Sequence, residues 1–243
     1  MKTSQLVKRR VCVFVALLSL TTVLSSCLKS KNDVPEPDIA AFSIVNSYPG
    51  NDAIDFYIDK RRVNLQPLLY TQSTGYFALY VGKRSVDITP SATTSKILHS
   101  STPTFAKNKY YTLFIARKMS TNADSLLSIF TTDSIPAQPS ADKARIRFAN
   151  LSPDAPTLDI LLKDGTPVIT GKAFKTVSDY VEVDPTKSDS IRIRATGTTT
   201  DKLKIAVPSK AGSSITIATN GLWSGTAGKD KFGAQAIINV QKQ

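Results

Sequence analysis

From residue 41 onward, apolar side chains recur at every second position in short runs. Ile54, Phe56 and Ile58, for example, alternate with Asp55, Tyr57 and Asp59. A period of two predicts strands with one buried side and one solvent-facing side. Besides residues 41–46 and 54–59, the same reading predicts strands at 76–81, 85–89, 110–116, 126–131, 145–150, 158–163, 180–183, 190–194, 203–207, 214–219 and 234–240. No segment combines sustained helical spacing with a capped start and stop, so the pattern predicts an all-β protein.

The pattern also repeats along the chain at an offset of 104 residues. The matched pairs are Asn46 and Asn150, Pro49 and Pro153, Ile54 and Leu158, Asp55 and Asp159, Tyr76 and Tyr180, and Thr112 and Thr216. About seven short strands in each roughly 100-residue copy are typical of an Ig-like, Greek-key β-sandwich. We therefore expect two tandem β-sandwich domains, residues 38–133 and 144–243, joined by a proline-bearing linker at 134–143.

The first 26 residues follow a different pattern, that of a secretory signal. Four basic residues and no acid accompany the apolar run at residues 11–20, which is shorter than the roughly 20 residues of a membrane-spanning helix. The segment Leu24-Ser-Ser-Cys27 resembles a bacterial lipobox, which predicts that Cys27 is acylated and becomes the first residue after cleavage. The alternative is an ordinary cleavage site near a small residue. The polar segment 27–37, which contains prolines, is then expected to act as a tether.

The predicted anchor also bears on location, charge and cysteine chemistry. Removing residues 1–26 takes four positive charges from the net charge of +12, which leaves +8 (12 − 4). Cys12 leaves with the signal and Cys27 carries lipid, so neither domain has a thiol for a disulfide, a metal or a nucleophile. We expect a cell-envelope protein held to the outer membrane by its lipid, on the periplasmic or the cell-surface face. Nucleic acid is not an expected partner in that place, and the oligomeric state is left open.

The start of the second domain carries a compact motif. Arg145 and Arg147 lie on one strand and Asn150 follows; then come the turn Ser152-Pro-Asp-Ala-Pro156 and Asp159 between apolar residues. These residues resemble the family called domain of unknown function 4397. The resemblance covers about the first half of this domain and weakens beyond residue 193. It implies a secreted or envelope-anchored β-sandwich, often in tandem, and it implies no catalytic or binding residues. The first domain keeps only Asn46, Pro49 and Ile54-Asp55.

Two arginine pairs are candidates for ligand binding. Arg145 and Arg147, and likewise Arg192 and Arg194, are two residues apart, which places each pair on one strand face. If the two strands are neighbours, the four guanidinium groups would form a basic stripe suited to sulfate, phosphate or uronate groups on a glycan or lipid. The alternative is a solvated sheet face whose charge is balanced by acids on adjacent strands.

Three other positions can be interpreted as either functional or structural. Asp159, like its copy Asp55, is expected to point outward, either toward a ligand or, as its presence in both copies favours, toward the adjoining proline turn. Trp223 lies in the Gly-rich loop 220–225, where an aromatic ring can stack on a sugar or else pack into the core. Ser134 lies in Asp-Ser-Ile, which resembles an Asp-Ser/Thr-aliphatic acceptor for protein O-glycosylation.

The sequence offers little for catalysis. It has a single histidine, His99, no Gly-x-Ser-x-Gly motif and no His or Cys cluster at metal-ligand spacing. We expect no enzymatic activity, no metal and no cofactor. The expected function is a non-catalytic binding, adhesion or structural role with a protein partner in the envelope; the alternative is a glycan-binding accessory lipoprotein of a polysaccharide-utilisation system.

Overall fold

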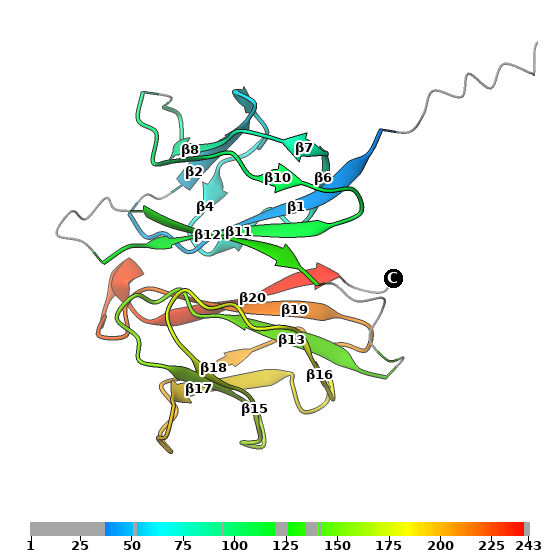
Figure 1. Ribbon diagram of the computed structural model, residues 1–243. Helices are drawn as coiled ribbons and strands as arrows, with labels where there is room; N and C mark the ends of the chain where they lie inside the picture. The colour runs from blue at the N-terminus through cyan, green and yellow to red at the C-terminus, as the bar shows by residue number, and fades with distance from the viewer. Residues whose placement is uncertain are drawn as a thin grey trace, which may run out of the picture. The chain divides into compact units, whose positions relative to one another are not determined.

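The computed structural model describes residues 37–50, 53–93, 95–119, 126–134, 140 and 142–240 (Figure 1). The chain from Asp38 onward forms one compact unit. Apart from one turn of 3₁₀ helix, η2 (Gly228–Asp230), the regular elements of the described chain are β-strands. The predicted all-β class is therefore confirmed.

The first half of the unit, up to Ser134, is a sandwich of two sheets. Its inner sheet has the order β12-β11-β1-β5, with β6 also paired to β1, and its outer sheet has the order β3-β2-β8-β9, with β4 also paired to β2. The inner strands are β1 (Ile39–Asn46), β5 (Gln72–Ser73), β6 (Phe77–Tyr80), β11 (Tyr110–Arg117) and β12 (Leu126–Asp133). The outer strands are β2 (Ala53–Ile58), β3 (Arg61–Arg62), β4 (Leu68–Leu69), β8 (Val86–Pro90) and β9 (His99–Ser101). A two-stranded ribbon is formed by β7 (Gly82–Lys83) and β10 (Thr104–Phe105).

The second half, from Ala144 onward, is built in the same way. Its inner sheet has the order β16-β13-β19-β20 and its outer sheet β15-β14-β17-β18. The inner strands are β13 (Ala144–Ala149), β16 (Val181–Val183), β19 (Ser214–Asn220) and β20 (Gly233–Val240). The outer strands are β14 (Leu158–Leu162), β15 (Pro167–Lys172), β17 (Ser190–Ala195) and β18 (Leu203–Ala206). In each half the opening strand pairs in parallel with a late strand, β1 with β11 and β13 with β19.

The repeat that the sequence predicts is visible in the strand register. Ile54 faces Leu68 as Leu158 faces Lys172, so both partners shift by 104. The offset grows to 105 at β8 and β17, where Thr89 and Arg194 face Asp55 and Asp159 (194 − 89 = 105). It reaches 106 at β12 and β20, where Thr131 and Ile237 face Thr112 and Thr216 (237 − 131 = 106). Small insertions between the strands therefore leave the pairing of the two copies equivalent.

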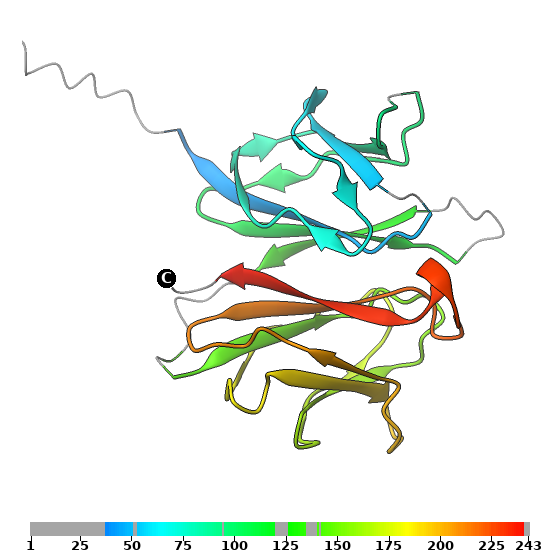
Figure 2. The same ribbon diagram turned by 180° about the vertical axis from the view of Figure 1, so that it is seen from behind.

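Each sandwich has its own core, and a third apolar cluster joins the two halves. Ile54, Phe56 and Ile58 point into the first core, and Leu158, Ile160 and Leu162 point into the second. The third cluster lies on the opposite faces of the two inner sheets and consists of Val45, Phe114, Ala116, Ala149, Leu151, Ala218 and Ile237. The layers of the compact unit therefore run outer sheet, inner sheet, inner sheet, outer sheet (Figures 1 and 2).

The repeated asparagine has the same structural role in both copies. The Asn46 amide donates to the Leu68 carbonyl at 3.2 Å and accepts from the Tyr48 N–H at 3.1 Å. The Asn150 amide donates to the Lys172 carbonyl at 3.0 Å and accepts from the Ser152 N–H at 3.2 Å. Both asparagines are fully buried. They fasten the turn after the opening strand to an edge strand of the outer sheet.

Replacing Asn150 with alanine is expected to destabilise the protein, because a buried carbonyl and a buried N–H both lose a partner. At about 1–3 kcal/mol for each of these two unsatisfied groups, the free energy of unfolding should fall by roughly 2–6 kcal/mol. Urea unfolding of the chain from residue 28 onward measures this, with the exposed Thr200→Ala as the control. A loss no larger than that of the control would show that these bonds are replaced by water.

Candidate functional site

Arg147 lies buried between the two halves, not on a ligand-binding surface. It is on β13, on the face turned away from the core of the second half, and only 3% of the residue is exposed. Its guanidinium binds the Asp133 carboxylate through both terminal nitrogens, at 2.5 and 3.1 Å. It also donates to the hydroxyls of Thr216 at 2.8 Å and Thr112 at 3.2 Å. The expectation that Arg147 contacts a ligand is therefore wrong, because its donors are used to join β13 to β12 and β11.

The ion pair lies within two equivalent polar groups, one from each half. Tyr76 and Thr112 donate hydrogen bonds to Asp133 in the first half. In the second half, Tyr180 and Thr216 donate to Asn239. The three members correspond through the repeat: Tyr76 to Tyr180, Thr112 to Thr216, and Asp133 to Asn239. Each half thus presents a Tyr-Thr-Asx group to the other.

The charges of the two copies are complementary. The position of Arg147 is occupied in the first half by Ser43, because both residues face the matched threonine of the parallel partner strand. The second half therefore carries the arginine with a neutral Asn239, and the first half carries Asp133 with a neutral Ser43. The Arg147 guanidinium also lies 4.9 Å from the ring centre of Tyr180. One cation meets one anion, and the buried interface has no excess charge at this point.

The pKa values of the groups match this arrangement. Burial acts to raise the pKa of Asp133, but the hydrogen bonds and the positive charge of Arg147 outweigh it, and that pKa lies below its ordinary value. Burial raises the pKa of Tyr76 and of Tyr180 above their ordinary values. Asp133 therefore remains an acceptor at neutral pH, while the two phenols remain protonated donors.

Removing one partner of the ion pair should lower the free energy of unfolding more than removing both charges. Arg147→Met leaves the Asp133 carboxylate buried and uncompensated, which typically costs about 3–5 kcal/mol of stability. Adding Asp133→Asn should recover much of that loss, because the same position in the other copy is Asn239. Urea unfolding of the two single variants and the double variant gives the coupling energy. Single-variant losses that simply add in the double variant would contradict the ion pair as the main link.

Arg145 is on the same strand and pairs with Glu182, the residue that holds the end of the linker. Arg145 is two residues before Arg147, but at the edge of the interface, and it pairs with Glu182 on β16 at 2.9 Å. Glu182 also accepts from the N–H and the hydroxyl of Ser140 at 3.2 and 3.0 Å. The hydrogen bonds from Arg145 and Ser140 hold the pKa of Glu182 below its ordinary value. Glu182 therefore fastens residue 140 to the second half, and Arg145 pairs with the same carboxylate.

Arg192 and Arg194 lie elsewhere, on the outward face of the outer sheet of the second half. Their strand, β17, is not in the same sheet as β13, so the four arginines do not form the single stripe that the sequence suggested. Arg192 pairs with Asp201 at 3.3 Å and faces the exposed Lys204 of β18. Among the described residues, the Arg194 side chain has no ion pair or hydrogen bond, and its Nε is buried without a partner. Arg192, Arg194 and Lys204 form a small basic face, which we call the β17 face.

Trp223 packs against the core, and the family motif holds its loop. The indole is half-buried and contacts Phe232 edge-on, with ring centres 5.0 Å apart. The Lys202 ammonium lies 4.9 Å from its ring centre. The Asp154 carboxylate accepts from the backbone N–H of Trp223 at 2.6 Å and of Ser224 at 2.9 Å. The structure thus assigns Trp223 a packing contact and gives the aspartate of the Ser-Pro-Asp-Ala-Pro turn a loop-fastening role.

The repeated aspartates point away from the cores, as predicted, but they are covered. Asp55 is 3% and Asp159 is 7% exposed. Asp159 accepts from the Gly171 N–H at 2.9 Å and the Thr196 hydroxyl at 2.6 Å. Asp55 accepts from the side chains of Arg62 and Asn64 and from the Ala92 N–H. Both carboxylates are structural, and their partners lie in neighbouring hairpins and not in the proline turn.

Ser134 lies at the edge of the interface between the halves. It is exposed and directly follows Asp133. With Arg147, Tyr180 and others it lines a cavity of about 90 Å³.

Cys27, the signal and most of the predicted tether lie outside the described residues, as does Ile135 of the glycosylation motif. Acylation and glycosylation therefore stay predictions.

Fold and polar network together define a tandem β-sandwich protein whose halves are docked through their inner sheets. The chain matches the model of the family described as Domain of unknown function (DUF4397) over residues 40–161, half of its length, and so belongs to that family. The match takes in the whole first half and ends within β14, so it extends well before the motif at residues 144–160. No curated protein matches the chain.

Among the residues that the structure describes, no helix is long and apolar enough to cross a membrane. Within the same residues, no group of three or more His, Cys, Asp or Glu side chains is placed to hold a metal ion.

Proposed function

We propose that the protein is a lipid-anchored, non-catalytic binding module of the cell envelope. The observation that carries this proposal is the docking of the two sandwiches. Besides the Arg147–Asp133 pair, Arg117 binds Asp230 at 2.7 Å, the Tyr70 hydroxyl donates to the Lys229 carbonyl at 3.0 Å, and Gln235 donates to Ser47 at 3.0 Å.

Contacts of this kind favour one rigid body over two independently moving domains. The polar residues that the repeat conserves, Asn150 and Asp159 among them, are used to fasten turns and loops. The faces left for a partner are those of the outer sheets and their loops, held by a scaffold that does not need to change shape. Rigid β-sandwiches that present loops and sheet faces commonly serve recognition. A protein partner in the envelope is the leading candidate.

The anchor is tested by Cys27→Ala in the full-length protein, expressed in a bacterium that processes lipoproteins. Loss of the acylated thiol should move the protein from the membrane fraction to the soluble fraction, because one or two acyl chains supply the membrane affinity. Fractionation followed by immunoblotting measures the shift, and Cys12→Ala, within the predicted signal, serves as the matched control. Retention of the Cys27 variant in the membrane fraction would contradict the proposed anchor.

A second candidate function is that of a glycan-binding accessory lipoprotein, and the β17 face favours it. Arg194 has no partner among the described residues, and Arg192 and Lys204 add positive charge beside it. An unpaired guanidinium group such as that of Arg194 suits a sulfate or uronate group, which it can bind with two parallel hydrogen bonds.

A glycan array that includes sulfated and uronate-containing glycans tests this face with the chain from residue 28 onward. Binding to acidic glycans should fall at least tenfold in Arg194→Ala, since a charge-assisted hydrogen bond contributes about 1.5–3 kcal/mol. Arg61→Ala, an exposed arginine of the first half, is the control. If the wild-type protein binds no glycan on the array, the result would favour a protein partner.

A further inference from the structure

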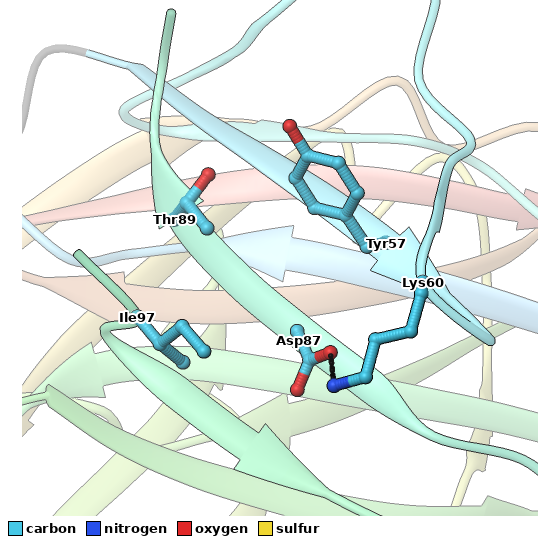
Figure 3. A pocket seen from close by; sticks show the side chains of 5 residues that line it. All are labelled: Tyr57, Lys60, Asp87, Thr89 and Ile97. Carbon is cyan, nitrogen blue, oxygen red and sulfur yellow. Dashed lines mark hydrogen bonds and ion pairs between the residues drawn. The ribbon is translucent and has the colours of Figure 1, made fainter. Parts of the chain in front are cut away.

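A pocket opens on the outward face of the outer sheet of the first half. It has a volume of about 190 Å³ and is lined by Tyr57, Lys60, Asp87, Thr89 and Ile97 (Figure 3). Asp87 and Thr89 rise from β8, Tyr57 stands beside them on β2, and Ile97 lies on the other side of β8. Tyr57 faces Asp87 in the strand register. The pocket thus has a polar floor between an aromatic wall and an aliphatic wall.

Thr89 is the feature that points to a ligand. The residue is only 3% exposed, and its hydroxyl is buried without a hydrogen-bond partner among the described residues. A buried hydroxyl left unpaired costs about 1–3 kcal/mol, so such a group in a folded protein calls for an explanation. Thr89 lines the pocket, where an occupant with its own hydroxyl groups could both donate to it and accept from it.

Asp87 and Lys60 supply further polar contacts and no net charge. The Lys60 ammonium binds the Asp87 carboxylate at 2.8 Å, and the Ser100 hydroxyl donates to the other carboxylate oxygen at 2.6 Å. Lys60 is held over Asp87 by the turn between β2 and β3, in which Asp59 and Lys60 have φ angles of 49° and 66°. An ammonium has three donors and a carboxylate about four acceptor sites, so both groups can make additional bonds.

The state of the carboxylate is fixed by its partners. Burial acts to raise the pKa of Asp87, but the hydrogen bonds from Lys60 and Ser100 and the charge of Lys60 outweigh it, and that pKa lies below its ordinary value. Asp87 is therefore an acceptor at neutral pH. The charged and titratable side chains around it are Lys60, on the turn, His99, on β9, and Tyr57, which faces it from β2.

We propose that this pocket binds one neutral pyranose unit of a glycan. An ion pair with no net charge favours a neutral occupant, and adjacent donors and acceptors suit the neighbouring hydroxyls of a sugar ring. The half-exposed Tyr57 ring and the Ile97 side chain suit its C–H faces. At about 190 Å³ the pocket is smaller than the roughly 300–1,000 Å³ of sites for drug-sized ligands, which favours one ring over a longer saccharide. This inference goes beyond the proposed function and depends on neither the anchor nor the β17 face.

Saturation-transfer difference NMR tests the proposal on the chain from residue 28 onward, which contains the whole compact unit. The probes are the methyl glycosides of glucose, galactose, mannose and N-acetylglucosamine, with glucuronic acid and glycine as charged comparisons. At least one neutral glycoside should give a saturable signal in the millimolar range. Absence of any neutral-sugar signal, or stronger binding of glucuronic acid or glycine, would overturn the proposal.

Thr89→Val separates the site from the stability of the fold. Valine has nearly the same shape, and the hydroxyl it replaces has no protein partner, so the urea midpoint should stay the same or rise. Sugar affinity should fall about five- to tenfold, the loss expected for one hydrogen bond to a buried group. Tyr57→Ala should remove the signal, and the exposed Thr200→Val should change neither measurement.

Two results with these variants would contradict the proposal. One is unchanged sugar binding in both Thr89→Val and Tyr57→Ala, which would place the sugar elsewhere. The other is a lowered urea midpoint in Thr89→Val, which would show that the hydroxyl is already bonded within the protein. Neither result affects the fractionation of the Cys27 variant or the coupling between Arg147 and Asp133, so failure of this site and failure of the proposed function are told apart.

Discussion

The buried contact between Arg147 and Asp133 is the interaction on which the arrangement of the two sandwiches depends. A guanidinium and a carboxylate removed from water are tolerable only when each satisfies the other and their remaining donors and acceptors are bonded. Here two tyrosines, two threonines and an asparagine from both halves meet that requirement. The apolar cluster around Phe114 and Ala218 supplies the burial, and the polar network fixes how the two sheets face each other.

Much of the fold could be predicted from the sequence. The alternation of apolar and polar residues shows which face of a strand is buried, and the offset of 104 residues shows that the two halves are copies of one another. The outer strand β15 could not, since its apolar residues do not alternate: within Pro167–Lys172 only Ile169 is buried. The two-residue strands β3, β4, β5, β7 and β10 are too short to show a period. Element class was therefore accessible where apolar and polar residues alternate along a strand of several residues.

The candidate residues show where periodicity stops being informative. It places Arg147 and Asp159 correctly on the faces opposite the cores, but it contains nothing about what covers those faces. For Arg147 the cover is the other half of the protein, and for Asp159 it is a hairpin. The matched pairs Tyr76 and Tyr180, and Thr112 and Thr216, were the one available signal, because paired polar residues kept in two copies indicate a shared contact. Thr89 and Asp87 left no signal, since a pocket depends on how a turn and a loop lie over a strand.

The unequal charge of the two copies bears on self-association. The interface uses corresponding positions from each half, as Val45 with Ala149 and Phe114 with Ala218 show, so the two inner sheets meet through equivalent faces. Two first halves would bury two carboxylates with no arginine, and two second halves would bury two guanidinium groups with no acid. Either homotypic pairing would leave several kcal/mol of uncompensated charge in the interface. Unequal charges therefore favour the pairing of a first half with a second half, and they disfavour association of two molecules through identical halves.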